Sequence, residues 1–185
     1  GSQAIAGHTI AKVFEKNIDA GGPLLKDKLW WWFGFTENDI NVFLITGQPD
    51  TTNLRNISGK VHGQWAGKLT YKAFYTNGDK VKLGRGGGID RPPETTWDQS
   101  GPSPIYGANV SYFFTPDLEV TFQYSQVDGG FAFTPNGDFT QQIFQDANGI
   151  YQNTFSIYQT DRPQTQYLVK GNYFFDTGSW DHELK

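Results

Sequence analysis

Residues 105–125 read IYGANVSYFFTPDLEVTFQYS, and this stretch decides the fold class. Apolar and polar side chains alternate along it on both sides of residues 115–117, which read TPD. Successive side chains of a strand point to opposite faces, so a period of two predicts two strands, each with an apolar face and a polar face. Proline presets φ at a turn position, and residues 115–117 are therefore expected to join the strands as a tight hairpin.

The same hairpin pattern recurs along the chain. Residues 57–76 and residues 166–175 alternate in the same way, and three tryptophans follow one another at positions 30–32. Counting partial segments, the pattern predicts about eight antiparallel strands. Besides the turn at 115–117, short turns are expected at residues 26–28, 66–68 and 176–179.

Long connections separate the predicted hairpins and hold most of the Gly, Pro, Asn and Asp residues. They cover residues 37–54, 77–104 and 127–163. Loops longer than about 12–15 residues are uncommon in compact domains, so their alternation with short turns needs a cause. A transmembrane barrel has short periplasmic turns and long extracellular loops, and its strands need about 9–11 residues to cross a bilayer. We therefore expect an all-β fold, an antiparallel up-and-down transmembrane β-barrel segment.

Composition agrees with a surface that is only partly in water. Aromatic residues make up 16% of the 185 residues, and charged residues, at 18%, fall below the roughly 25% of soluble domains. The mean hydropathy of −0.54 does not exclude a membrane, because only alternate residues of a barrel strand face lipid. A net charge of −4 argues against a nucleic-acid partner, and the absence of Cys excludes disulfides and thiolate chemistry.

Aromatic residues gather beside the short turns, where an interfacial girdle is expected. They are Trp30, Trp31, Trp32, Trp65, Phe113, Phe114, Phe174, Phe175 and Trp180. Between them, Val110, Tyr112, Phe122 and Tyr124 are predicted to face lipid. The opposite set, predicted to face the lumen, is Asn109, Ser111, Thr121 and Gln123.

The two ends of the chain lead us to expect a barrel that does not close on itself. Residues 8–20 alternate poorly because Lys12, Glu15, Lys16 and Asp19 interrupt any apolar face, and the last segment has only about five residues. We expect residues 1–185 to form one partial β-barrel domain of a longer protein. We expect neither a plug domain nor the closure of the barrel within these residues.

One hairpin resembles a known family. Residues 21–34, GGPLLKDKLWWWFG, resemble a barrel hairpin of TonB-dependent receptors, most closely the Oar-like receptors common in Acidobacteria. Residues 91–99, RPPETTWDQ, and residues 181–185, DHELK, are similar to weaker motifs of the same family. The resemblance implies uptake of a bulky nutrient, such as a siderophore, cobalamin, glycan or peptide, across the bacterial outer membrane. It also implies outer-membrane lipid as a partner, and TonB through parts not seen here.

No enzyme or cofactor is expected. The three histidines, His8, His62 and His182, lack metal-ligand spacing, and residues 84–88 lack the strand–loop–helix setting and the Lys-Ser/Thr of a phosphate loop. Residues 146–149, DANG, are read as a turn and not as a calcium loop. Candidate ligand contacts lie in the long loops, since loops on a rigid scaffold usually carry binding groups. They are Arg85, Arg91, Trp97, Phe131, Phe133 and Tyr151.

Three alternatives stay open. The loop aromatics can instead pack on each other and hold the loops down. The chain can be a small closed barrel with a structural or adhesive role in the outer membrane. It can also be a soluble β-sandwich that binds carbohydrate through aromatics such as Trp97 and Tyr151.

Overall fold

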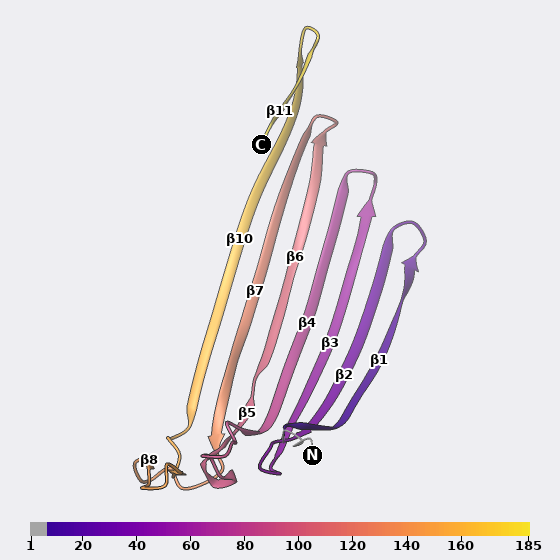
Figure 1. The fold of residues 1–185 in the computed structure, drawn as a ribbon. Helices are drawn as coiled ribbons and strands as arrows, with labels where there is room; N and C mark the ends of the chain where they lie inside the picture. Colours follow the sequence, from indigo (N-terminus) through magenta and orange to yellow (C-terminus); the bar gives the residue numbers. More distant parts are fainter. Residues whose placement is uncertain (1–6) are drawn as a thin grey trace.

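The computed structural model describes residues 7–185 and shows a long antiparallel meander, without any α-helix in that range (Figure 1). The sheet has nine strands, and a separate two-stranded ribbon lies in the last long loop. The long strands are β1 (Thr9–Leu25), β2 (Leu29–Phe43), β3 (Pro49–Trp65), β4 (Leu69–Arg85), β6 (Pro102–Thr115), β7 (Leu118–Pro135) and β10 (Tyr158–Thr177). The short elements are η1 (Pro93–Thr95), β5 (Trp97–Ser100), β8 (Phe144–Gln145), β9 (Tyr151–Gln152) and β11 (Trp180–Leu184).

Strands that follow one another in sequence are neighbours in the sheet. The order runs β1-β2-β3-β4, then β6, β7, β10 and β11, and every pair is antiparallel. The short β5 continues the place of β6 between β4 and β7 at the loop end. The expected all-β meander and its four short turns are therefore confirmed. No helix among residues 7–185 is long and apolar enough to cross a membrane.

Strand and loop lengths differ from expectation. The long strands have 14 to 20 residues and not about 9–11. The connection between β2 and β3 is residues 44–48 and not 37–54, so the strict alternation of short and long connections is wrong there. The other two loops shrink to residues 86–96 and 136–157. Residues 36–42 are mostly polar and are typical of a loop in sequence, but here they extend the hydrogen-bonded ladder of β2 and β3 beyond its apolar part.

The sheet stays open, as expected. In the described chain β1 pairs with β2 alone, and β11 pairs with residues 173–177 of β10 and not with β1. The register also explains the poor alternation of β1. Its apolar face begins at Ile18, which lies opposite Phe35, whereas Lys16 lies opposite Glu37 in a charged row.

The hairpin turns climb steadily across the sheet, as Figure 1 shows. One row of paired residues serves as a reference. It consists of Leu29, Gly63, Tyr71, Val110, Phe122 and Val169. Beyond this row β2 has no residue before its turn, whereas β3 continues two residues to Trp65, β6 five to Thr115 and β10 eight to Thr177. From the turn between β1 and β2 to the turn between β10 and β11, the line of turns climbs eight residues, or about 26 Å at about 3.3 Å per residue. These two turns are six strand spacings apart, or about 29 Å at about 4.8 Å per spacing. The strands are therefore tilted by about 42° from the perpendicular to the line of turns.

One face of the sheet is apolar along a band between the turns and the loops. Residues paired across antiparallel strands share a face, so the rows place Val110 with Phe122 and put Asn109 with Gln123 on the other side. On β2 the band covers Leu29 to Phe35, and on β10 it covers Tyr167 to Phe175. From β2 to β10, the limit of the band nearer the loops moves four residues toward the turns, counted from the reference row. The limit nearer the turns moves six residues in the same direction. The band therefore runs obliquely across the strands and follows the line of turns.

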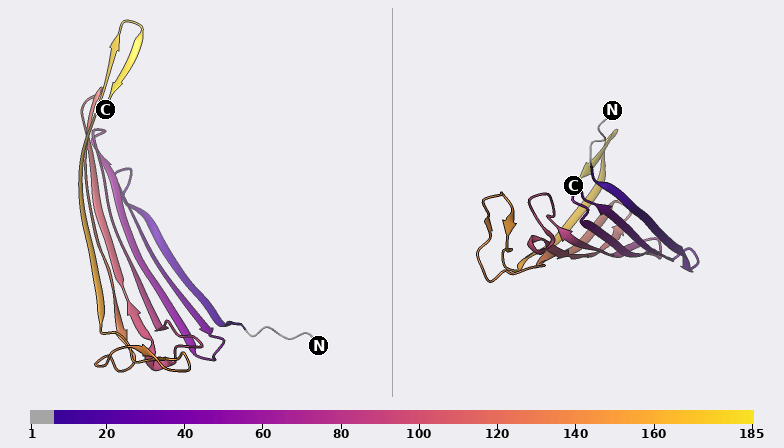
Figure 2. Two further views of the ribbon diagram at one scale, coloured as in Figure 1. Left: turned by 60° about the vertical axis from the view of Figure 1, so that its left-hand side comes forward. Right: turned by 60° about the horizontal axis from the view of Figure 1, so that its bottom comes forward.

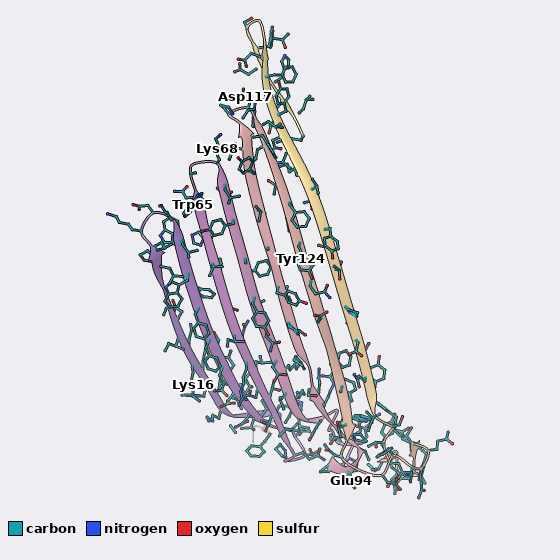
Figure 3. The ribbon with its side chains drawn as sticks, turned by 180° about the vertical axis from the view of Figure 1, so that it is seen from behind. Lys16, Trp65, Lys68, Glu94, Asp117 and Tyr124 are labelled. Carbon is teal, nitrogen blue, oxygen red and sulfur yellow. The ribbon has the colours of Figure 1, made fainter. Side chains whose placement is uncertain are left out.

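The opposite, polar face carries part of the aromatic set found near the turns. Trp30, Trp32, Phe113 and Phe174 lie on it, because every second residue of an aromatic run points to the other side. Trp30 stacks on His62 with ring centroids 5.6 Å apart. Figure 3 shows Trp65, Lys68 and Asp117 at the turn end, Glu94 at the loop end and Tyr124 between them. Only the remaining aromatic residues can belong to a girdle on the apolar face.

Gly107 tests the packing of the polar face. A Cβ at this position would lie 2.6 Å from the carbonyl oxygen of Tyr124 and 3.0 Å from the ring of Phe74. Because the backbone oxygen cannot move without disturbing the ladder, we expect Gly107→Ala to lower the free energy of unfolding by about 1–3 kcal/mol. Urea unfolding of the purified protein in detergent measures the loss. Gly171→Ala is the control, since its Cβ meets nothing within 4 Å, and equal losses in both variants would contradict the predicted contact.

Candidate functional site

The polar face is hollowed from the turns to the loops. Near the turns a cavity of about 460 Å³ is lined by Trp30, His62 and Lys72. Toward the loops, a groove of about 400 Å³ crosses from β2 to β7 and is bordered by Asn38, Asn56, Gln99 and Phe131 among others. We call this second hollow the loop-end groove. Most of the side chains that line these two hollows sit on the polar face.

The six residues predicted as ligand contacts all lie at the loop end of the sheet. Arg85 ends β4, Trp97 begins β5, and Tyr151 begins β9. Phe131 and Phe133 belong to β7, and Arg91 lies in the loop before η1. The left view of Figure 2 shows the loops gathered at this end as a layer across the ends of the strands. The structure brings the six residues together as two adjoining clusters.

The first cluster, the loop clasp, consists of Arg91, Trp97, Tyr151 and Phe155. The guanidinium carbon of Arg91 lies 3.8 Å from the centroid of the Tyr151 ring and 5.6 Å from that of Trp97. Trp97 stacks on Phe155 at 4.3 Å and is 7% exposed. Such cation–π and stacked contacts fasten the 144–157 segment onto the loop that follows β4. For Trp97 the contacts therefore favour the packing alternative over direct ligand contact.

Buried threonines stiffen the base of the clasp. Thr95, Thr96 and Thr154 are at most 2% exposed. The hydroxyl groups of Thr95 and Thr96 donate hydrogen bonds to the carbonyl oxygens of Pro92 and Pro93, at 2.8 and 2.6 Å. The side-chain amide of Asn136 donates to Thr96 Oγ1 at 3.1 Å and to Asp98 Oδ1 at 3.0 Å, which ties the loop after β7 to β5. The loop layer is thus held by its own polar contacts.

The second cluster, the aromatic platform, consists of Phe131, Phe133 and Tyr158. Their ring centroids lie 5.0 to 5.8 Å apart. Arg85 approaches Phe133 to 5.1 Å and donates to Gln99 Oε1 at 2.9 Å, while Arg162 approaches Phe131 to 5.4 Å. Tyr158 is 44% exposed, so the aromatic platform is accessible to solvent, whereas Trp97 of the loop clasp is buried.

Sequence reasoning missed Arg162. It fell within the predicted long loop 127–163, although extending the period of two backward from Lys170 through Gln166 and Gln164 places Arg162 on the polar face. That extension is the signal that could have found it. The predicted loop 127–163 is too long and therefore assigns the arginine to an irregular segment, whereas β10 begins at Tyr158.

Two loop carboxylates have lowered pKa values. The backbone N–H of Ile150 is the largest cause of the lowered pKa of Asp146, and the N–H of Asn148 adds to it. The hydroxyl and N–H of Thr140 lower the pKa of Asp138. Residues 146–149 thus form a turn around a carboxylate acceptor, as the sequence suggested.

Metal and family comparisons give no further lead. Within residues 7–185, no three or more His, Asp or Glu side chains are grouped so that they could hold a metal ion. Searches of protein-family models, curated proteins and solved structures found no match to this chain. The arrangement itself offers two kinds of contact to a ligand: stacking on aromatic rings, and hydrogen bonding to arginine and amide groups.

Removing Trp97 tests the role of the clasp. A buried tryptophan replaced by alanine loses about 3–5 kcal/mol of packing free energy, here between the loop segment and β5. We expect Trp97→Ala to leave the sheet intact and to expose residues 136–157 to hydrogen exchange and to protease. Phe139→Ala, at a ring that is 45% exposed, is the control and should change neither readout. Unaltered protection of 136–157 in Trp97→Ala would show that the clasp does not hold the loop.

Acid should loosen the same loop. The folded pKa values of Asp138 and Asp146 lie below the ordinary 3.8, so their stabilising effect is fully present above that pH and is lost as the pH falls through the lowered values. We expect pepsin cleavage within 136–157 to accelerate as the pH drops below 3.8. The double variant Asp138→Asn/Asp146→Asn keeps acceptor oxygens without titrating, and its cleavage should depend less on pH. An identical pH profile in both proteins would argue against this linkage.

Proposed function

We propose that the chain forms part of an outer-membrane β-barrel receptor of the TonB-dependent kind, which takes up a bulky nutrient. Its apolar face contacts lipid, and its polar face lines the lumen. The observation that carries the proposal is the oblique apolar band, which follows the line of turns across the sheet. In a barrel, both the turns and the lipid-facing band lie parallel to the membrane plane, so both cross the tilted strands at the same slope.

The strand tilt supports the same reading. The climb of the turns corresponds to about 42°, and transmembrane barrel strands are tilted by about 35–45°. On β3 the band covers the nine residues from Ile57 to Trp65. Eight steps of about 3.3 Å, reduced by this tilt, give a height of about 20 Å, close to the roughly 25 Å apolar band of such barrels.

Exposure of the apolar face disfavours the soluble sandwich. Phe122 is 44% exposed, Val169 69% and Tyr167 70%. In a sandwich a second sheet would cover such a face, but the ribbon of β8 and β9 is the only other sheet in the described chain and lies at the loop end. Trp97 is the single buried apolar side chain among residues 7–185.

The open edges disfavour a small closed barrel made of these strands alone. β1 and residues 158–172 of β10 each present one unpaired ladder. Exposed edges cannot remain in lipid, where backbone groups have no water to bond, so further strands must pair with both. A barrel larger than this sheet supplies them, and this agrees with the receptor resemblance of residues 21–34.

A charge placed on each face tests the proposal. An arginine in place of Phe122, near the middle of the band, should lower stability in a bilayer by about 2–4 kcal/mol. In place of its neighbour Gln123, on the polar face, it should cost little. We expect Phe122→Arg, and not Gln123→Arg, to reduce the folded, heat-modifiable protein in the outer-membrane fraction of cells that express the full protein. A soluble protein, or equal tolerance of both variants, would refute the membrane assignment.

A further inference from the structure

We propose that the loop-end groove binds an acidic oligosaccharide, lying in extended form across the strands. This inference rests on the proposed receptor function and names the nutrient class. Four features carry it: the length of the groove, the donor groups along it, the aromatic platform at its end, and the unpaired cations beside it.

The groove is long, and its floor is low in the middle. Its lining runs from Asn38 on β2, over β3 and β4, to Phe131 on β7. Four strand spacings of about 4.8 Å give a length of about 19 Å. Gly78, on β4, adds no side chain to the lining, which leaves the middle of the floor low. An extended chain of sugars fits this shape better than a compact metal complex, which would touch only part of it.

Two amide side chains of the groove keep free donor groups. Asn56 Oδ1 already accepts hydrogen bonds from Ser58 and Thr76, at 2.9 and 3.1 Å, and Gln99 Oε1 accepts one from Arg85 at 2.9 Å. The amide nitrogens of Asn56 and Gln99 therefore remain to donate to a ligand. A carboxylate only accepts hydrogen bonds, so all of its lone pairs can use such donors, whereas a sugar hydroxyl also has a proton to donate. The groove thus favours a ligand with carboxylate groups.

The charged side chains around the groove also favour a ligand with carboxylate groups. Lys80 lines it and, in the described part of the chain, makes no ion pair or side-chain hydrogen bond, whereas Lys82 is neutralised by Asp50 at 2.5 Å. Arg162 stands over Phe131 without an acidic partner among residues 7–185. Asp79 is the one carboxylate in the lining, and its place in β4 puts its side chain on the opposite face. Lys80 and Arg162 are thus free to bind carboxylates, and Arg162 can do so bidentately.

The aromatic platform completes the site. Phe131 belongs both to the groove lining and to the platform with Phe133 and Tyr158. Aromatic faces pack against the apolar faces of sugar rings. Arg162, beside the Phe131 ring, places a cation within reach of a carboxylate on a sugar stacked there. Stacking at one end and amide donors along the length suit a repeating acidic sugar chain.

Calorimetry on the full protein in detergent tests the proposal, with an oligogalacturonate as the probe and a neutral galacto-oligosaccharide of the same length as its control. We expect the acidic probe to bind and the neutral one to bind at least tenfold more weakly. Arg162→Gln and Phe131→Ala should each lower affinity for the acidic probe about tenfold, since a charge-assisted contact or a stacked ring contributes on that order. Lys72→Gln, a cation of the same face near the turns, should leave affinity unchanged.

A charge reversal guards against misfolded variants. Gln99→Glu keeps an acceptor for Arg85 and adds a negative charge to the groove, so we expect a folded protein that no longer binds the acidic probe. Equal binding of acidic and neutral probes, or binding unaffected by Arg162→Gln and Gln99→Glu, would overturn the inference. If the protein is found in the outer membrane but binds neither probe, this inference fails while the receptor function stands.

Discussion

The sheet has an apolar face that nothing else in the described chain covers, and most of its other features follow from that. Folding normally buries apolar surface inside the molecule, yet here a single apolar side chain, Trp97, is buried among residues 7–185. The backbone ladders satisfy the main chain of the inner strands, whereas the two edge strands keep unpaired backbone groups and the apolar face stays uncovered in the described chain. In the proposed barrel, lipid would cover the apolar face and further strands would pair with the two edges.

The long hairpins were predictable because their signal is local. Alternation on both sides of residues 115–117 fixes which side chains share a face, and a one-residue slip would exchange the faces completely. Strand ends were not predictable from the same pattern. Beyond Phe35, β2 continues through a stretch rich in Glu, Asn and Asp, residue types that are depleted in strands. They pair because β3 offers a matching edge, and only the register shows Glu37 between Lys16 and Arg55, with ion pairs of 3.1 and 3.0 Å.

The candidate site was predictable in its residue types but not in its grouping. Loop aromatics and arginines suggested ligand contacts, but contacts such as Arg91 with Tyr151 join residues far apart in sequence and leave no periodic trace. The grouping also separates their roles. Trp97 is enclosed by Phe155 and Arg91 and acts in loop packing, whereas Phe131 and Arg162 lie on the polar face of regular strands. Side chains on strands are held more rigidly than those on loops, so the accessible cluster is also the better positioned one.

The oblique band and the loop-end groove are linked through strand length. Because the band ends at Phe35 on β2 while the strand continues to Phe43, the ladder carries its polar face beyond the proposed lipid layer. Asn38 lies in this extension and Asn56 lies on β3 close to it, so the groove is built on regular backbone at the level where the proposed lumen opens toward the loops. Strands that only crossed the bilayer would have left these amides on loops. The extra strand length thus places the groove between the apolar band and the loop layer, where a ligand that had passed the loops would meet it.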